Sequence, residues 1–419
     1  MRILQGKAAE AYVRSIEHRG SRLDEIEPAV RKIVEDVRRN GDGALSKYAR
    51  KFDGLGAKQN LRVDELELRS AWKAAPKELR AALQVAEKNI RRFCEWQKPK
   101  EWRRSTNGAM LGQLVRALDS AGCYVPGGRF PLISTLLMTV IPAQVARVKN
   151  IRVVSPRPSR EVLAAAGMLG VTEFYRVGGA QAIAALAYGT QTIPRVDKIV
   201  GPGNLYVTAA KKLVSFDCAI DMLAGPTEGM IISDNGDPAF IAADLLAQAE
   251  HDPETLVIFV TTSKQLADKV SHEVENGGRG RPPLQNNAIA AQAIASRGAI
   301  LIAASKAQAF EWANRIAPEH ITVGKDALPM VQNAGSVFVG NYSAQAAGDY
   351  ASGPNHVLPT AGAARFRGGL SVMDFVKLIT VQDLSSQGLT RIAKSIVTLA
   401  ETEGLKAHAD SIRVRCARA

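Results

Sequence analysis

The sequence predicts an α/β fold with mostly parallel sheets, flanked by helical segments toward both ends of the chain. Between Tyr124 and Gly225, short β-rich runs alternate with alanine-rich helical stretches such as residues 180–187. The β-rich runs are residues 151–154, 174–177 and 198–200. This alternation is typical of βαβ units, in which a helix returns the chain so that successive strands run parallel.

A second series of strands and helices follows the first. Its predicted strands are residues 230–233, 256–260, 299–303, 321–323 and 336–339. The helix predicted over residues 238–250 begins at Pro238 and carries Ile241, Leu245 and Leu246 on one face. A helix packed on a sheet has this pattern, so the chain contains two α/β regions.

The segments on either side of these regions have helical patterns. Within residues 23–97, apolar residues recur at spacings of three and four, as in Val30, Ile33, Val34 and Val37. From about Phe375 onward an apolar stripe predicts helix again, with Gly404 as a stop between two helices. The stripe consists of Ile392, Ile396, Leu399 and Ala400.

Length and composition indicate a folded protein of two or three domains. The chain has 419 residues, and single cores rarely grow beyond about 250–300 residues. The first residues carry charges in every turn, which excludes a secretory signal. The longest uncharged run, residues 327–348, is too polar to span a membrane. We therefore expect a cytoplasmic protein without a membrane partner.

Cysteine usage and charge exclude further classes. The four cysteines lie far apart and form no Cys-x-x-Cys pair, so neither a thiolate zinc site nor a disulfide framework is supported. The net charge of +13 makes a basic RNA-binding protein one alternative, testable by a salt-sensitive gel shift. The basic residues are dispersed and lack an RNA-binding aromatic signature beside them. We expect a solvated basic surface and no nucleic-acid partner.

Histidine is sparse, with six in the chain, and four of them stand in unusual sequence contexts: His251, His320, His356 and His408. Gln248 and His251 are three residues apart near the end of a predicted helix, so both side chains can share a metal. The alternative is a histidine that merely favours the helix C-terminus. Asp349 lies in a turn-rich stretch, where it is either an acidic ligand or a turn residue. Nitrogen and oxygen ligands of these types suit Zn²⁺ or Mn²⁺.

The dipeptide Glu319-His320 is a candidate for proton transfer. Pro318 disfavours helix at Ala317, so the pair is expected in an extended segment at the mouth of a strand, where active sites of α/β folds gather. A histidine can take a proton near neutral pH, and a carboxylate beside it can activate water. A surface salt-bridge pair is the alternative.

Several long strings, in order along the chain, carry a family resemblance. They are GCYVPGGRFPLISTLLM, VGGAQAIAALAYGT, DKIVGPGN, AGPTE, LLAQAEHDP, APEHI and AGDYASGPNHVLPT. This set resembles the histidinol dehydrogenases, and the resemblance covers essentially the whole chain. It implies oxidation of L-histidinol to L-histidine through L-histidinaldehyde, the last steps of L-histidine biosynthesis, with two NAD and one Zn²⁺ per subunit.

The resemblance also implies roles for individual residues. Glu319 activates water and His320 accepts protons. The implied zinc ligands, which also touch the substrate, are Gln248, His251, Asp349 and His408. The implied NAD contacts are Tyr124, Gln181 and Asn204, and further substrate contacts are Thr227, His320 and Glu403. His356 is implied to lie close to the site.

The same resemblance implies two Rossmann-like parallel-sheet domains, one inserted in the other, with helical N-terminal and C-terminal segments. We expect a helical arm over residues 1–24, a discontinuous α/β domain with the metal and catalytic residues over 25–123 and 229–370, and an inserted NAD-contacting domain over 124–228. Residues 371–419 are expected to form a helical tail that completes the partner's site in a homodimer with shared active sites.

Two features depart from the pattern, and alternatives follow. Thr227 stands where the family commonly has serine, which keeps the hydroxyl and adds a methyl group. No Gly-x-Gly-x-x-Gly fingerprint appears in either α/β region, so NAD is implied by the resemblance alone. One alternative is a related zinc-dependent dehydrogenase of another small alcohol, such as a sulfonated diol. A zinc hydrolase with Glu319 as base is another.

Overall fold

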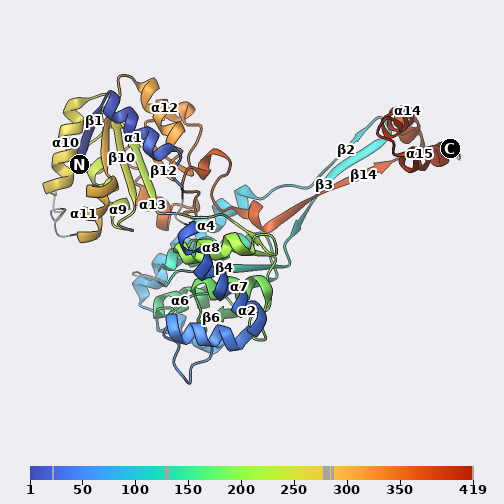
Figure 1. The fold of residues 1–419 in the computed structure, drawn as a ribbon, viewed down its shortest axis with the longest axis horizontal. Coiled ribbons are helices and arrows are strands. Elements are labelled where there is room, and N and C mark those ends of the chain that lie inside the picture. Colours follow the sequence, from blue (N-terminus) through green and yellow to red (C-terminus); the bar gives the residue numbers. More distant parts are fainter. Residues whose placement is uncertain (21–22, 128–131, 277–283, 285–286, 418–419) are drawn as a thin grey trace.

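Two parallel sheets and one antiparallel arm make up the protein (Figure 1). The computed structural model describes residues 1–20, 23–127, 132–276, 284 and 287–417. Part of the first family-like string, residues 128–131, lies outside the described residues. The six-stranded, five-stranded and three-stranded sheets are named sheet A, sheet B and sheet C below.

Sheet A contains the second α/β region together with the first strand of the chain. Its strands, in spatial order, are β1 (Arg2–Gln5), β11 (Ala299–Ile302), β10 (Leu256–Thr261), β9 (Glu228–Ile232), β12 (His320–Val323) and β13 (Ser336–Val339), all parallel. One face is covered by α1 (Lys7–Glu17) and α12 (Lys306–Ile316). The other is covered by α9 (Pro238–Ala249), α10 (Lys264–Asn276) and α11 (Ala288–Arg297). Because both faces are covered, the central strands are apolar and fully buried.

Sheet B contains the first α/β region. Its spatial order is β6 (Glu173–Tyr175), β5 (Asn150–Val154), β4 (Ser120–Tyr124), β7 (Lys198–Val200) and β8 (Ala219–Ile220), again all parallel. The helices α3 (Glu65–Ala74), α4 (Lys77–Gln97), α5 (Ile133–Val145) and α6 (Arg160–Met168) share the core on one face. On the other face lie α2 (Leu23–Phe52), α7 (Gly179–Tyr188) and α8 (Leu205–Val214).

The two parallel sheets share one strand order. When the strands of each sheet are numbered in chain order, leaving out β1 of sheet A, both sheets have the spatial order 3-2-1-4-5. This is the order of the first five strands of the classic dinucleotide-binding fold. The α/β class, and the prediction of two Rossmann-like parallel-sheet regions with one inserted in the other, are therefore confirmed.

Sheet C forms an arm that extends away from both sheets (Figure 1). It consists of β2 (Trp102–Thr106), β3 (Ala109–Ala117) and β14 (Val376–Leu384), which pair antiparallel in the order β14-β3-β2. At its far end lie α14 (Ser386–Thr402) and α15 (Lys406–Cys416). The remaining short elements are α13 (Gln345–Tyr350) and the 3-10 helices η2 (Lys325–Met330), η3 (Ala363–Arg365) and η4 (Val372–Phe375).

The strand predictions are confirmed, whereas the predicted domain boundaries differ from the packing. Each strand predicted in the two α/β series is present. Residues 25–97, however, pack mainly on sheet B, because the apolar stripes of α2 and α4 are buried against helices of sheet B. Their contact with residues 229–370 is smaller and includes the hydrogen bond from Asn89 to the backbone oxygen of Ala351 at 2.9 Å. The predicted helical arm of residues 1–24 includes a strand, β1, which extends sheet A.

The tail was also predicted as entirely helical, and that prediction is wrong for its first part. Residues 376–384 form β14, which pairs along its whole length with β3. Polar and apolar residues do not alternate over Lys377, Leu378, Ile379 and Thr380, so this stretch has no strand period. The partner strand also lies far away in the sequence. Nothing local in the sequence indicates that pairing.

Gly201, which follows β7, is required by both its backbone conformation and its surroundings. It has a φ of +113°, and a Cβ atom at this position would lie 2.2 Å from the backbone oxygen of Tyr124. Gly170, in the same part of the protein, has a φ of +67° with no atom within 4 Å of such a Cβ. The two glycines therefore separate backbone strain from steric overlap.

We expect Gly201→Ala to destabilise the protein by about 3 kcal/mol or more, because the overlap with Tyr124 adds to the cost of the positive φ. Gly170→Ala is the matched control and should lose only about 1–2 kcal/mol. Urea denaturation measures both. Equal losses in the two variants would show that the close approach to Tyr124 carries no cost.

Candidate active site

Glu319 and His320 lie at the amino end of β12. Helix α12 ends at Ile316, Ala317 takes a left-handed conformation with φ 50°, and His320 is the first residue of the strand. The extended segment predicted for the pair is therefore present at His320. It lies at the opposite edge from the one expected, since ligands of parallel α/β sheets usually bind at the carboxyl ends.

Both side chains are buried and share one neighbour, Glu228, at the start of β9. The exposed fractions of Glu319 and His320 are 6% and 3%. The backbone N–H of Glu228 donates to Oε2 of Glu319 at 3.0 Å, and the backbone oxygen of Glu228 lies 3.4 Å from Nδ1 of His320. Nδ1 of His320 is 3.7 Å from Oε2 of Glu319. The predicted pair is thus a buried pair, not a surface salt bridge.

Burial and charge set the protonation of this pair. Burial raises the pKa of Glu319 to about 8, although the charge of His320 and the Glu228 N–H oppose the shift. For His320, burial disfavours the charged ring, but the negative charges of Glu319 and Asp349 outweigh it and raise the pKa. Two such groups side by side are suited to exchanging protons near neutral pH.

Asp349, at the end of α13, faces the same histidine. Its Oδ1 lies 3.4 Å from Nε2 of His320, and its side chain is 14% exposed. Burial raises the pKa of Asp349, but the hydrogen bond and charge of His320 prevail and lower it. His356 supports this segment, because its Nδ1 lies 2.8 Å from the backbone oxygen of Asp349 and its Nε2 lies 3.4 Å from Oγ1 of Thr135 on α5.

Gln248 and His251 lie at the C-terminal end of α9, as predicted. Nδ1 of His251 is 3.1 Å from the backbone oxygens of Ala247 and Gln248, which leaves Nε2 free to bind a metal or substrate. The side chain of Gln248 is buried, and among the described residues neither its Oε1 nor its Nε2 has a hydrogen-bond partner. A buried amide without partners is costly unless a ligand satisfies it.

These residues fit a metal site that one chain leaves incomplete. The charge of His251 contributes to the lowered pKa of Asp349. Within the described residues, no three His, Cys, Asp or Glu side chains lie close enough to hold a metal ion. One further nitrogen ligand, added to the Gln248 amide, His251 and Asp349, would make a set that suits Zn²⁺.

Glu403 and His408 are not brought to this site. Glu403 follows α14 and His408 lies in α15, and both are exposed. These helices stand at the far end of the arm, well away from sheet A in the same chain (Figure 1). Thr227, in contrast, directly precedes β9, and its backbone oxygen accepts from the N–H of Leu256 at 2.9 Å. It therefore lies at the same edge of sheet A as Glu228.

The three predicted NAD contacts lie at the carboxyl edge of sheet B, where its strand order reverses between β4 and β7. Tyr124 ends β4, and its hydroxyl accepts from the N–H of Gly179 at 3.1 Å. Gln181, on α7, donates through Nε2 to Oδ2 of Asp53 at 3.0 Å. Asn204 caps α8 through the N–H of Val207 at 3.1 Å. This edge is the usual dinucleotide position.

A buried ion pair holds the turn that precedes Asn204. Lys211 pairs with Asp221 and also donates to the backbone oxygen of Gly201 at 2.9 Å. Oδ2 of Asp221 accepts from the N–H of Gly201 at 2.7 Å. Both polar atoms of Gly201 are thereby fixed, so the turn is rigid. Neither Asp221 nor Asp53 is indicated by the sequence, because a lysine ten residues before an aspartate carries no signal of its own.

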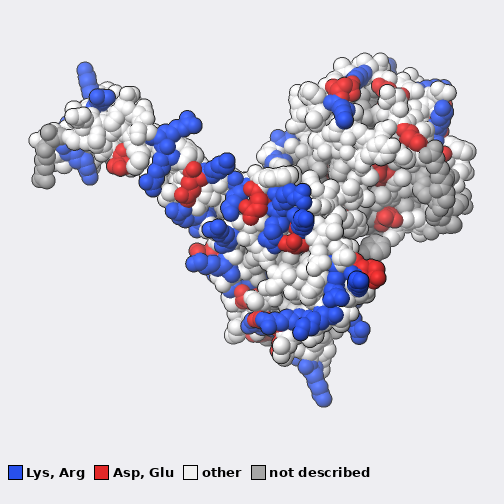
Figure 2. Space-filling model, turned by 180° about the vertical axis from the view of Figure 1, so that it is seen from behind, with Lys and Arg blue, Asp and Glu red and all other residues white. Residues whose placement is uncertain are grey.

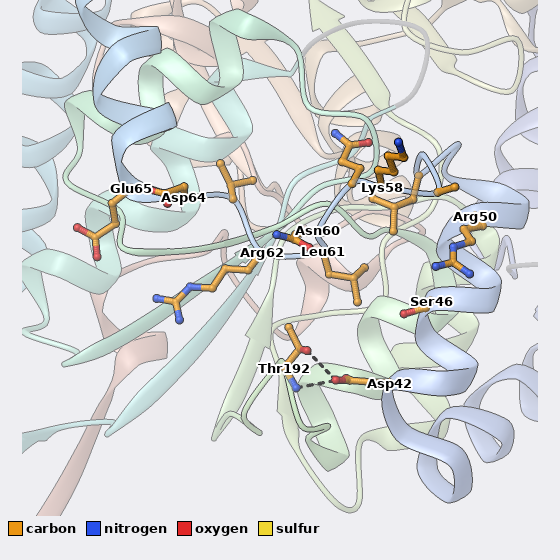
Figure 3. A pocket seen from close by; sticks show the side chains of 14 residues that line it. Asp42, Ser46, Arg50, Lys58, Asn60, Leu61, Arg62, Asp64, Glu65 and Thr192 are labelled. Atoms are coloured by element: carbon orange, nitrogen blue, oxygen red, sulfur yellow. Dashed lines mark hydrogen bonds between the residues drawn. The ribbon is translucent and has the colours of Figure 1, made fainter.

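A hollow of about 900 Å³ lies elsewhere on the sheet B part (Figure 3). It is lined by the end of α2, the chain before α3 and Thr192, and it includes none of the predicted site residues. Asp42, one of the lining residues, already has hydrogen-bond donors, since its carboxylate accepts from the N–H and Oγ1 of Thr192 at 3.2 and 2.6 Å. We assign no ligand to this hollow.

Basic side chains are spread over the surface, as expected from the sequence. Figure 2 shows lysine and arginine along the arm and across the sheet B part, with acidic residues among them. Several of the basic residues are paired, as in Arg116 with Glu101 and Arg413 with Glu401. The absence of a nucleic-acid partner remains a prediction.

Comparison with known proteins identifies the family. A family model described as histidinol dehydrogenase matches residues 16–416. The chain belongs to this family. The histidinol dehydrogenase of Geobacter sulfurreducens is 46% identical over 403 residues, covering 93% of each chain, and that of Methanothermobacter thermautotrophicus is 44% identical over 405 residues, covering 94% of each.

Solved structures agree with this result. The chain is similar to the crystal structure of histidinol dehydrogenase from Elizabethkingia anophelis, with a TM-score of 0.93, 36% identity, and coverage of 99% of this chain and 98% of the other. An acetylating aldehyde dehydrogenase from Geobacillus thermoglucosidasius has a TM-score of 0.50 at 12% identity and shares the fold alone. The chain is therefore an NAD-dependent oxidoreductase, and the match to histidinol dehydrogenases does not favour the sulfonated-diol alternative.

The unpartnered amide of Gln248 gives a prediction for the metal-free protein. Gln248→Met removes two unsatisfied buried polar atoms, so the metal-free variant should be about 1–3 kcal/mol more stable than the parent protein. The variant should also bind Zn²⁺ about 10–100-fold more weakly, because it lacks the amide oxygen. Urea denaturation and zinc titration against a chelator measure the two effects.

The control is Gln144→Met, because Gln144 is fully paired. Its Nε2 donates to the backbone oxygen of Leu169 at 2.7 Å, and its Oε1 accepts from Arg91 at 2.9 Å. This variant should lose stability and keep its zinc affinity. Unchanged zinc affinity in Gln248→Met would remove Gln248 from the ligand set.

Proposed function

We propose that this protein oxidises L-histidinol to L-histidine through L-histidinaldehyde, using two NAD. The buried Glu319–His320 pair beside Asp349 is the observation that carries this proposal. It supplies a base and a water-activating carboxylate at one place, which are the groups that an alcohol oxidation followed by an aldehyde oxidation needs. Membership of the histidinol dehydrogenase family supports the substrate.

The proton-transfer role falls to Nε2 of His320. Its Nδ1 is directed toward the backbone oxygen of Glu228, so Nε2 is the nitrogen that faces the Asp349 side of the site. In the first oxidation, Nε2 takes the hydroxyl proton of histidinol as a hydride passes to NAD, which leaves the aldehyde and NADH. The aldehyde stays in the site, where side reactions are limited.

Glu319 acts in the second oxidation. Its carboxylate, held by the Glu228 N–H, orients water and takes one of its protons as the water oxygen adds to the aldehyde carbon, while His320 returns the proton from the first oxidation to the carbonyl oxygen, which gives a hydrate. His320 then accepts a hydroxyl proton from the hydrate as the second hydride passes to another NAD. The product is the carboxylate of histidine, and two NADH are released for each histidinol.

The proposed zinc ligands are Gln248, His251, Asp349 and His408, with one ion per subunit. Zn²⁺ held there supplies a positive centre that fixes the imidazole and amine of histidinol. Thr227 and Glu403 are the proposed additional substrate contacts. Glu403 can accept a hydrogen bond from the amine N–H of the substrate, and the hydroxyl of Thr227 replaces the serine of the family. The proposed NAD contacts are Tyr124, Gln181 and Asn204, which lie together at the carboxyl edge of sheet B.

The arm supports a homodimer in which each site is shared. The predicted apolar stripe of α14 faces solvent in one chain, with Ile392 43% and Leu399 64% exposed, and only Ala400 of the stripe is buried. A small three-stranded arm with exposed apolar residues is stable only when another surface covers it. We propose that the arm docks on a second copy, so that Glu403 and His408 complete the partner's site.

The proposed location is the cytoplasm. In the described ranges, no helix combines the length and the apolar composition needed to span a membrane. The buried cysteines Cys94, Cys123 and Cys218 are free thiols, which is usual for proteins of reducing compartments.

The first test counts products. Purified, zinc-loaded protein incubated with limiting L-histidinol and excess NAD should form two NADH per histidinol, because both oxidations occur in one site. Absorbance at the NADH band and chromatography of histidine measure the ratio. A sulfonated diol serves as the control substrate. Activity only on that diol would keep the fold and overturn the substrate.

The second test addresses the shared site. His320→Ala and His408→Ala should each be inactive alone. A mixture allowed to exchange subunits should regain up to about one quarter of the parent activity, because half of the dimers are hybrids and one of the two sites in each hybrid is intact. Native mass spectrometry verifies the exchange. No recovery despite verified hybrids would show that His408 acts within its own chain.

A further inference from the structure

The backbone of Glu228 contacts the side chains of both members of the Glu319–His320 pair. Its N–H donates to Glu319 at 3.0 Å and its oxygen faces Nδ1 of His320 at 3.4 Å. The parallel register of β9 and β12, in which Gly229 lies opposite His320, places this peptide beside the pair. Any displacement of Glu228 therefore displaces partners of both side chains.

The side chain of Glu228 is fixed as firmly as its backbone. It is 4% exposed, and its carboxylate accepts from three donors. Nε of Arg19 donates to Oε1 at 2.6 Å, a second nitrogen of Arg19 donates to Oε2, and the N–H of Ala361 donates to Oε1 at 2.8 Å. Such a two-point contact between guanidinium and carboxylate sets orientation as well as distance.

Arg19 also binds the chain segment that precedes Glu319. Its third nitrogen donates to the backbone oxygens of Ile16 and Ile316, at 2.8 and 2.9 Å. These oxygens belong to the last turns of α1 and α12, where a positive charge is favoured by the helix dipole. Ile316 is only three residues before Glu319, so one guanidinium holds both the strand and the loop that carry the catalytic groups.

We propose that Arg19 and Glu228 are positioning residues that hold Glu319 and His320 in their reactive arrangement. The proposal rests on the function given above and assigns no contact with substrate to either residue. The Glu319 contact, at 3.0 Å, is shorter than the His320 contact, at 3.4 Å. The step that requires Glu319 is therefore the more sensitive of the two.

The test compares Arg19→Met with Arg315→Met. Arg315 lies on α12 and pairs with Glu10 and Glu17 of α1, at 2.9 and 2.7 Å, so it joins the same two helices without contacting the site. Both variants lose an arginine from one interface. Only Arg19→Met releases Glu228.

Histidinaldehyde separates the two steps. Its oxidation with NAD requires Glu319, whereas its reduction with NADH requires only the proton of His320. Arg19→Met should lower kcat about 100-fold for aldehyde oxidation and about 10-fold for aldehyde reduction, with the KM for NAD and the zinc affinity within twofold of the parent protein. Arg19→Lys keeps the charge without the two-point contact and should recover part of the loss.

Arg315→Met should also lower Tm, though less than Arg19→Met, which leaves a buried carboxylate without its partner, and it should leave both kcat values within twofold. Equal kcat losses in the two variants, or a loss in Arg19→Met matched by weaker zinc and NAD binding, would overturn the positioning role. Hydrogen exchange of residues 225–230 and 317–321 gives a readout that does not depend on activity. Faster exchange in Arg19→Met than in Arg315→Met supports the role, and equal exchange contradicts it. If the parent protein did not oxidise histidinol, the proposed function would be wrong. Hydrogen exchange would still test whether Arg19 and Glu228 position Glu319 and His320.

Discussion

The parallel pairing of β9 with β12 is the constraint on which the site depends. It places the peptide of Glu228 beside Glu319 and His320, at the amino edge of sheet A. Both catalytic groups are buried there, and burial is what raises the pKa of Glu319 to about 8. Because a buried carboxylate needs firm hydrogen bonding, the strand register and the protonation of the pair are set together.

The two parallel sheets have the same strand order, but their candidate site residues lie at opposite edges. Sheet B presents Tyr124, Gln181 and the turn before Asn204 at its carboxyl edge, where its order reverses. Sheet A presents its catalytic pair at the amino edge. The segment after α13 joins the two parts, since Asn355 donates to the backbone oxygen of Met138 at 2.7 Å and His356 approaches Thr135. Under the proposed function, this arrangement would let NAD held at sheet B meet a substrate held at sheet A.

The arm differs from the two sheets in how few of its residues are buried. Its strands and its terminal helices bury few side chains within one chain, with only Gly388 and Ala400 of α14 and Ala409 of α15 buried. Its apolar residues are therefore available to a second copy. The proposed zinc ligands Gln248, His251 and Asp349 would need one more residue. In the proposed homodimer, a shared site would cover the exposed apolar surface and satisfy the buried polar groups together.

The sequence by itself determined the α/β class, the strands of both regions, and the local pairs Gln248 with His251 and Glu319 with His320, because hydrophobic period, helix spacing and adjacency are short-range properties. The tertiary structure alone decided that residues 25–97 pack on sheet B, that residues 376–384 form a strand on the arm, and which edge of sheet A bears the pair. It also decided the roles of Asp53, Arg19 and Glu228 as partners. Each of these contacts joins residues far apart in the chain, and such contacts leave no periodic signal in either segment.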